Sequence, residues 1–117
     1  MAVLDRPRRF ETFRASVQDI ELAVVILSDD IPNAVRQVVV ACELVPLEGG
    51  AIIGAPTWVT LAKGETGLPV ASAANPGSPV TIPKNALIER LGRVSAFERA
   101  ALDRAIRLPY GYEDWPI

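Results

Sequence analysis

Two nearly continuous hydrophobic runs in the first half of the chain predict buried β-strands. The first covers residues 22–28 and the second covers residues 35–42. Continuous runs of this length are typical of strands that are buried on both faces. The segment between them, residues 29–33, combines aspartate, proline and asparagine and predicts a turn. Because so little chain separates the two runs, we expect them to pair as antiparallel neighbours.

Shorter patterns predict further strands on either side of this pair. Residues 9–14 alternate in the manner of a first strand, and residues 56–61 alternate around a tryptophan. Residues 68–73 contain a proline, which favours a position at the edge of a sheet. Residues 80–84 form an apolar segment that ends in Pro83-Lys84. Loops are predicted for the segments rich in glycine, proline and polar residues, 47–50, 63–67 and 75–79.

A helix is predicted for residues 95–108. Ser95 and Glu98 have the spacing of a capping box, in which the hydroxyl accepts from a free N–H and the carboxylate reaches back to the backbone. Pro109 ends the helix. The apolar half of the helical wheel, which we expect to pack on the sheet, contains Phe97, Ala101, Leu102, Ala105, Ile106 and Leu108. The polar, solvent-facing half contains charged residues spaced for i, i+4 ion pairs, at Arg99, Asp103 and Arg107.

These elements predict a single domain that is mainly β with a C-terminal helix. The domain covers residues 1–117, and half of these residues are hydrophobic. A chain of this length can bury a core without disulfides or metals. Five or six short strands and one helix fit a small, strongly curved β-barrel with the helix packed across it. An aromatic tail, residues 109–117, follows the helix.

The composition excludes several kinds of chemistry. Histidine is absent, which rules out Ser-His-Asp and Cys-His catalysis. Cys42 is the only cysteine, so we expect no zinc site and a reduced, cytoplasmic setting. No apolar stretch approaches the ~20 residues that a membrane span needs, and four of residues 5–9 are charged, at Asp5, Arg6, Arg8 and Arg9, where a signal peptide would be apolar.

The charge is unevenly distributed. The net charge of −2 argues against a generally basic, nucleic-acid-binding surface. Four arginines nevertheless cluster in the first fourteen residues, at Arg6, Arg8, Arg9 and Arg14. This cluster is either a local basic patch or a solvated N-terminal arm.

Several short segments occur in an order that points to a known family. They are the apolar run Leu22–Ser28 that ends in serine, the valine-rich Val38–Ala41, Pro56-Thr57-Trp58-Val59, Ile82-Pro83-Lys84 with Leu87, and Gly92-Arg93-Val94-Ser95 before the helix. In this order they resemble the MazF/PemK toxin family and its structural relatives, the CcdB toxins. The resemblance covers residues 9–108.

The resemblance implies a fold, a function and partners. It implies an SH3-like β-barrel of the CcdB/MazF type that forms a homodimer and is neutralised by a cognate antitoxin. MazF-like members are endoribonucleases that cleave single-stranded RNA without a metal, so no metal or cofactor is expected. A chain without histidine suits that chemistry. The resemblance also implies that the loop between the first two strands, at residues 15–20, gates the substrate site and moves.

Two positions depart from the family pattern. The family places an Arg-Pro pair before the second strand, where this chain has Glu21-Leu22. It also places a serine or threonine after the third strand, where this chain has Glu43-Leu44-Val45-Pro46. Both departures leave open whether the chain is catalytically active.

The candidate site residues follow from these departures. Arg14 or Arg36 would bring positive charge near a scissile phosphate, and Glu43 would serve as a base. Glu21 and Lys63 are the candidate substrate-binding residues. The alternative for each of them is an ordinary exposed side chain.

The C-terminal tail supports a second hypothesis. CcdB-like toxins poison DNA gyrase through a Trp-Gly-Ile end, and this chain stops at Trp115-Pro116-Ile117. Trp115 and Ile117 would then contact gyrase. An aromatic tail that covers an apolar patch on its own domain or on its dimer mate is the alternative. A third possibility is a catalytically silent family member that binds a partner.

Overall fold

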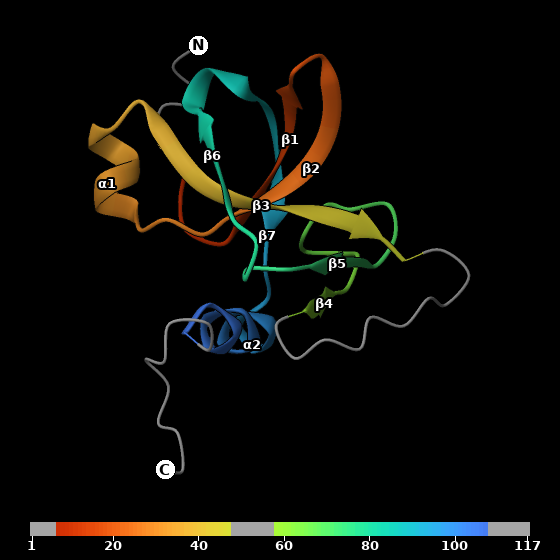
Figure 1. Cartoon of the computed structure of the whole chain (residues 1–117). Coiled ribbons are helices and arrows are strands. Elements are labelled where there is room, and N and C mark those ends of the chain that lie inside the picture. The colour runs from red at the N-terminus through yellow and green to blue at the C-terminus, as the bar shows by residue number, and fades with distance from the viewer. Residues whose placement is uncertain (1–6, 48–57, 108–117) are drawn as a thin grey trace.

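The computed structural model describes residues 7–47 and 58–107, and these residues form a curved antiparallel sheet with helix α2 packed against it (Figure 1). The predicted features at residues 48–57, Leu108 and the tail 109–117 lie outside the described residues. The elements in chain order are β1 (Glu11–Val17), β2 (Ile20–Ile26), α1 (Asp30–Val35), β3 (Val38–Pro46), β4 (Val59–Leu61), β5 (Ser72–Ala74), β6 (Val80–Pro83), the 3-10 turn η3 (Lys84–Ala86), β7 (Leu87–Arg93) and α2 (Ala96–Arg107).

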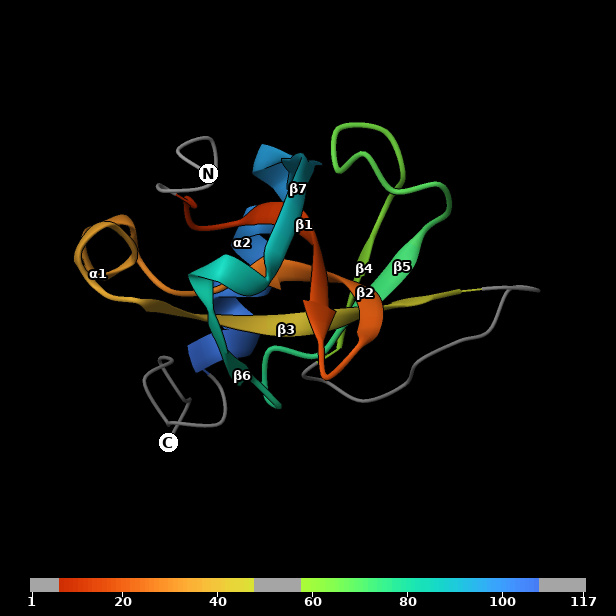
Figure 2. The ribbon, with the colours of Figure 1, turned by 90° about the horizontal axis from the view of Figure 1, so that it is seen from above.

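The sheet follows the order β4-β5-β3-β2-β1-β7, and β6 also pairs with β3. Strands β5 and β6 lie one after the other along the same edge of β3, which crosses the molecule from α1 at one end to β5 at the other (Figure 2). Register shifts between β1 and β7 add local twist. Over the described residues no pairing joins β4 to β7, so the sheet is an open, barrel-like form. The predicted β fold with a C-terminal helix is confirmed.

The two hydrophobic runs supply the central antiparallel pair, as predicted, but the predicted bounds are wrong: β2 ends at Ile26 and Val35 belongs to α1. Strand β3 begins at Val38 and continues to Pro46, so residues 43–46 lie in the strand and do not follow it. Val25 lies opposite Cys42, and Ile26 lies opposite Ala41. Val25 and Cys42 belong to one buried cluster, whereas Ile26 and Ala41 belong to a second cluster on the other face. The second half of β2 is therefore buried on both faces, which explains its unbroken apolar sequence.

The predicted turn at residues 29–33 is wrong, because most of it belongs to helix α1. Asp29 caps this helix by accepting from the N–H of Asp30 at 2.8 Å. Pro32 is tolerated because it lies in the first turn, where its missing N–H costs no helical hydrogen bond. The buried Asn33 amide donates to the carbonyls of Pro7 at 3.0 Å and Ser28 at 2.8 Å. These tertiary contacts fix a helix that is too short to be stable alone.

The position of β5 also differs from the prediction. The proline that suggested an edge strand, Pro69, precedes the strand, which begins only at Ser72. Strand β5 lies between β4 and β3, so it is interior and β4 is at the edge. A short strand without proline can be interior because all its ladder donors remain available.

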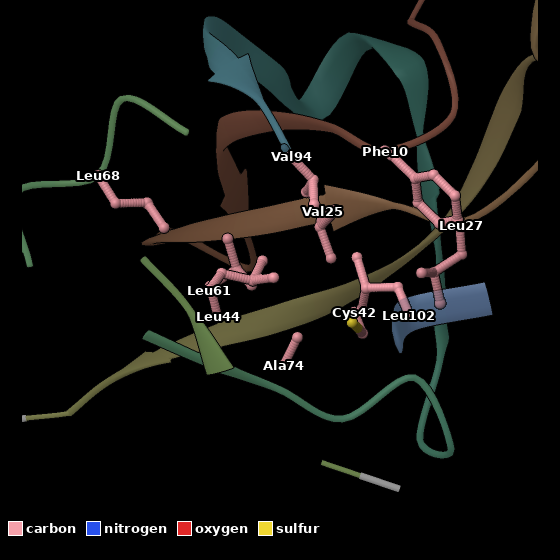
Figure 3. Close-up of a cluster of buried hydrophobic side chains, with 10 residues drawn as sticks. All are labelled: Phe10, Val25, Leu27, Cys42, Leu44, Leu61, Leu68, Ala74, Val94 and Leu102. Carbon is pink, nitrogen blue, oxygen red and sulfur yellow. The ribbon is translucent and has the colours of Figure 1, made fainter. Parts of the chain in front are cut away.

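Helix α2 packs on the sheet through fewer residues than its apolar half predicts. Leu102 is fully buried in the cluster of Figure 3, and Ala105 is also buried. Phe97 is 87% exposed and Ala101 is exposed, so their prediction as packing residues is wrong. The cluster is Phe10, Val25, Leu27, Cys42, Leu44, Leu61, Leu68, Ala74, Val94 and Leu102.

The helix cap is partly as predicted. The hydroxyl of Ser95 accepts from the N–H of Glu98 at 3.2 Å and donates to Glu98 Oε1 at 3.0 Å. The carboxylate does not reach the backbone of Ser95. Its Oε2 accepts from the N–H of Ala62 at 2.8 Å, which ties the start of α2 to the end of β4.

A turn at residues 64–67 lies directly on β7. The N–H of Arg93 donates to the carbonyl of Glu65 at 2.9 Å. Gly67 has a φ of +70°, and a side chain there would overlap the carbonyl of Leu91. A side chain at Gly92 would overlap the carbonyl of Glu65. Glycine is required at both positions because the two backbones touch.

Candidate active site and a basic groove

Arg14 meets two carboxylates from neighbouring strands. It lies on β1 opposite Ala23 of β2 and Glu89 of β7. Its guanidinium donates to Glu21 Oε1 at 2.8 Å and to Glu89 Oε1 at 3.1 Å. These hydrogen bonds, first that of Glu21 and then that of Glu89, raise the pKa of Arg14 above its ordinary value. Arg14 is therefore a permanent cation held in a fixed orientation between two acids.

Glu21 also lines a cleft of 260 Å³ at the end of the β2–β3 pair. Glu43 contributes to the same lining, but it lies opposite Val24 in the register, so its side chain is on the other face of the sheet from that of Glu21. The described residues that line it are Glu21, Leu22, Ala23, Glu43, Leu44, Pro46, Leu68, Pro69, Val70 and Ser72. Of the predicted residues, the structure brings Arg14 and Glu21 together here.

The remaining predicted residues lie elsewhere. Arg36 is exposed at the C-terminal cap of α1, where its N–H donates to the carbonyl of Pro32 at 2.9 Å. Lys63 is exposed in the turn after β4. Neither residue lines the cleft. Trp115 and Ile117 lie outside the described residues.

The connection between β1 and β2 is shorter than the family resemblance implies. Val17 pairs with Ile20, so only Gln18 and Asp19 form the turn. Both have positive φ, at 52° and 67°, as in a type I′ hairpin. Residues 15–20 are thus mostly paired strand, and the β1–β2 connection is a two-residue turn.

A second candidate site, which the sequence did not predict, is a cavity of 680 Å³ between α2 and the segment before β1. We call it the α2 groove; its lining is Arg8, Arg9, Phe10, Asp29, Asp30, Arg93, Ala96, Arg99, Ala100, Asp103 and Arg107. The Asp103 carboxylate forms ion pairs with the guanidinium groups of Arg9, at 3.1 Å, and Arg107, at 3.2 Å. The predicted pair between Asp103 and Arg107 is therefore confirmed, whereas the predicted pair between Arg99 and Asp103 is wrong, because Asp103 contacts Arg9 instead. The charged helix face was visible in the sequence, but its proximity to Arg8 and Arg9 depends on the fold.

None of the helices that the structure describes is long and apolar enough to cross a membrane.

Comparison with known proteins places the fold and the family. A search of curated proteins gave no match. Among solved structures, an endoribonuclease in complex with its cognate antitoxin from a mycobacterial species is 24% identical, with a TM-score of 0.79 over 94% of this chain and 99% of that chain. The toxin MazF-mt6 of Mycobacterium tuberculosis is 23% identical, with a TM-score of 0.74 over 90% of this chain and 99% of that one.

A more distant relative has the same fold. The MazF of a MazE-MazF structure from Deinococcus radiodurans is 16% identical, with a TM-score of 0.75 over 92% of this chain and 98% of the other. The sequence profile of the "PemK-like, MazF-like toxin of type II toxin-antitoxin system" family matches residues 10–109. That span includes every strand of the described residues and the whole of α2, and the chain therefore belongs to the PemK-like, MazF-like toxin family of type II toxin-antitoxin systems.

Proposed function

We propose that this toxin cleaves single-stranded RNA without a metal ion, with Arg14 and Glu21 as its catalytic residues. Membership of the family and a fold shared with solved endoribonucleases support the reaction class. The observation that carries the residue assignment is the 2.8 Å contact between the Arg14 guanidinium and Glu21 at the edge of the cleft. The family's own arginine is replaced by Glu21, and Arg14 brings a guanidinium to that position from the neighbouring strand.

The chemistry needs a base and a cation. Glu21 accepts the proton of a ribose 2′-hydroxyl, and the 2′-oxygen then attacks the adjacent phosphorus. The new oxygen–phosphorus bond forms as the bond from phosphorus to the 5′-oxygen breaks, and water supplies the proton to the leaving oxygen. The products are a 2′,3′-cyclic phosphate and a 5′-hydroxyl. Arg14 stabilises the extra negative charge on the phosphate oxygens in the transition state.

Glu89 acts as a positioning residue. It holds Arg14 from the side opposite to Glu21, through the 3.1 Å hydrogen bond to the guanidinium nitrogen Nε. With one cation between two carboxylates, the cluster carries a net negative charge before RNA binds. A substrate phosphate therefore competes with the carboxylates for Arg14.

The family also supports a place in a toxin-antitoxin pair. Two of the similar solved structures are described as complexes, one with a cognate antitoxin and one of MazE with MazF. We extend this to the present chain: it acts in the cytoplasm as a homodimer, arrests growth when expressed alone, and is neutralised by its own antitoxin.

The test is cleavage of a long single-stranded RNA in the presence of EDTA. The wild-type protein should give fragments with 2′,3′-cyclic phosphate ends, and Arg14→Ala should be slower by about a hundredfold or more. Arg36→Ala, which removes an exposed arginine away from the cleft, is the matched control and should cleave normally. Circular dichroism should show that both variants fold, because exposed ion pairs contribute little stability.

Two results would contradict the proposal. The first is equal loss of activity in Arg14→Ala and Arg36→Ala. The second is an intact RNA together with double-strand breaks trapped by DNA gyrase, which would favour the gyrase-poison alternative instead.

A further inference from the structure

We infer that the α2 groove binds the phosphate backbone of the single-stranded RNA beyond the nucleotides held at the cleft. The inference deepens the proposed function and rests on it for the identity of the ligand. It assigns a binding role to Arg93, Arg99 and Phe97, none of which lies at the cleft.

The charges in the α2 groove are unbalanced. Among the described residues, five arginines and three aspartates line it, which is an excess of two positive charges in that part of the chain. Two of the aspartates form ion pairs with other groove arginines: Asp103 contacts Arg9 and Arg107, and Asp30 contacts Arg8 at 3.9 Å. Within residues 7–47 and 58–107, neither Arg93 nor Arg99 forms an ion pair. Arg93 and Arg99 are therefore the two groove arginines whose charge no aspartate of the described residues neutralises by direct contact.

Arg99 also has an unused donor. Its Nε is buried and has no hydrogen-bond partner in the described part of the chain, and the same is true of Arg9 Nε. Buried polar groups are normally hydrogen-bonded, and a guanidinium pairs most strongly with carboxylate or phosphate oxygens. An anion in the groove would supply the negative charge that Arg93 and Arg99 lack, whereas Arg9 already contacts Asp103.

An exposed aromatic ring lies next to this groove. Phe97, at 87% exposure, is on the first turn of α2. It directly follows Ala96 and precedes Ala100 by three residues, and both alanines line the groove. At about 100° per residue, Phe97 lies roughly 60° around the helix from Ala100 and on nearly the opposite side from Arg99, so the ring flanks the groove on the side of Ala100. A ring of this size remains exposed without benefit to folding, so it is available for a ligand.

Cations combined with an exposed ring favour single-stranded RNA as the ligand. Proteins that bind single strands use a positive groove for the backbone and aromatic side chains on which bases stack. The groove begins at Phe10, and Arg14 is four residues further along the chain, roughly 13 Å at the rise of a β-strand. An RNA of several nucleotides spans that distance.

The experiment measures binding separately from cleavage. A fluorescent 2′-O-methyl oligoribonucleotide cannot be cleaved, and its anisotropy reports affinity at several salt concentrations. For the double variant Arg93→Ala/Arg99→Ala we expect about tenfold weaker binding and a salt slope that is shallower by roughly 1.4, or 0.7 for each lost phosphate contact. For Phe97→Ala we expect about tenfold weaker binding with an unchanged salt slope.

The control is Arg36→Ala/Lys84→Ala, which removes two cations that do not line the groove. If it weakens binding as much as the groove variant, the effect is one of net charge and the inference is overturned. Unchanged affinity in the groove variant also overturns it. So does a groove variant that binds RNA normally but loses the cognate antitoxin, since the groove would then serve the antitoxin. The proposed function is judged independently, by the cleavage rate of Arg14→Ala.

Discussion

Arg14 and Arg99 are both partly exposed arginines, yet their surroundings differ in charge. Arg14 is held between Glu21 and Glu89, so its site is net negative and its donors are occupied. Arg99 lines a groove with a positive excess, and its Nε has no partner among the described residues. The first setting fixes the direction of a guanidinium, whereas the second leaves one free to bind a ligand.

This contrast separates positioning from affinity. Exposed ion pairs add little to stability, so the carboxylates around Arg14 are better explained by orientation. The same carboxylates repel RNA. A chain with acids at its cleft therefore needs positive charge elsewhere to attract a polyanion, and the α2 groove supplies it.

The largest expected effect concerns the helix that carries the groove. Leu102 is fully buried between α2 and the sheet, so Leu102→Ala should lower the free energy of unfolding by about 2–5 kcal/mol. Phe97→Ala, on the exposed side of the same helix, should change it by less than about 0.5 kcal/mol. Urea denaturation measures both. Equal losses would mean that Phe97 packs on the protein and is not available to RNA.

The second effect concerns the contact that separates the two sites. The turn 64–67 lies on β7 at Gly92, between Glu89 near the cleft and Arg93 at the groove. In Gly92→Ala the new methyl group meets the backbone of Glu65, which should cost about 1–3 kcal/mol. Thermal unfolding followed by both RNA assays should show binding and cleavage falling together. Wild-type stability in this variant would show that the turn can move away from β7 at little cost.

A smaller effect should follow from reducing the negative charge at the cleft. Glu89→Gln keeps an oxygen that can accept from Arg14 but removes a charge that repels RNA. The half-saturating RNA concentration should fall about two- to fivefold at low salt, with little change in maximal rate. Glu43→Gln, on the other face of the sheet, should change it less. A fall in maximal rate alone would assign Glu89 a role in the chemistry.

The smallest effect at neutral pH concerns Cys42, which lies far from solvent in the core. Burial raises the pKa of its thiol to about 12, partly offset by a backbone hydrogen bond from Asn75. The folded state thus holds this proton more tightly than the unfolded state, whose thiol has a pKa near 9.0. Its contribution to stability is complete below pH 9 and is lost as the pH rises toward 12.

Alkylation by iodoacetamide, followed by mass spectrometry, tests this burial. At pH 8 the native protein should react slowly and the urea-unfolded protein quickly. Rapid alkylation of the native protein would show that the core opens readily around Cys42.

The sequence predicted the central strands because burial on both faces leaves a direct mark, an unbroken apolar run such as residues 22–28. The sequence of helix α1 contains no comparable pattern. Its aspartates and Pro32 are also turn residues, and the contacts that fix it come from Asn33 to Pro7 and Ser28. The helical wheel identified the apolar face of α2 but not how much of that face the sheet covers. Phe97 was therefore predicted to pack on the sheet, whereas it is exposed.

The sites were harder to predict than the fold. Arg14 was a candidate, but its partners depend on the registers of β1 with β2 and β7, which periodicity does not determine. The α2 groove brings Arg9 and Arg99 together from opposite ends of the chain. Only the packing of α2 against the start of β1 makes them neighbours.

The central claim is that Arg14 acts in the chemical step and the α2 groove acts in RNA binding. Single-turnover cleavage measured against RNA concentration tests it directly. For Arg14→Ala we expect a maximal rate lower by about a hundredfold, with a half-saturating concentration close to that of the wild type. For Arg93→Ala/Arg99→Ala we expect the reverse: an unchanged maximal rate and a half-saturating concentration about tenfold higher. If both variants change the same parameter, the two sites are not separate and the account is wrong.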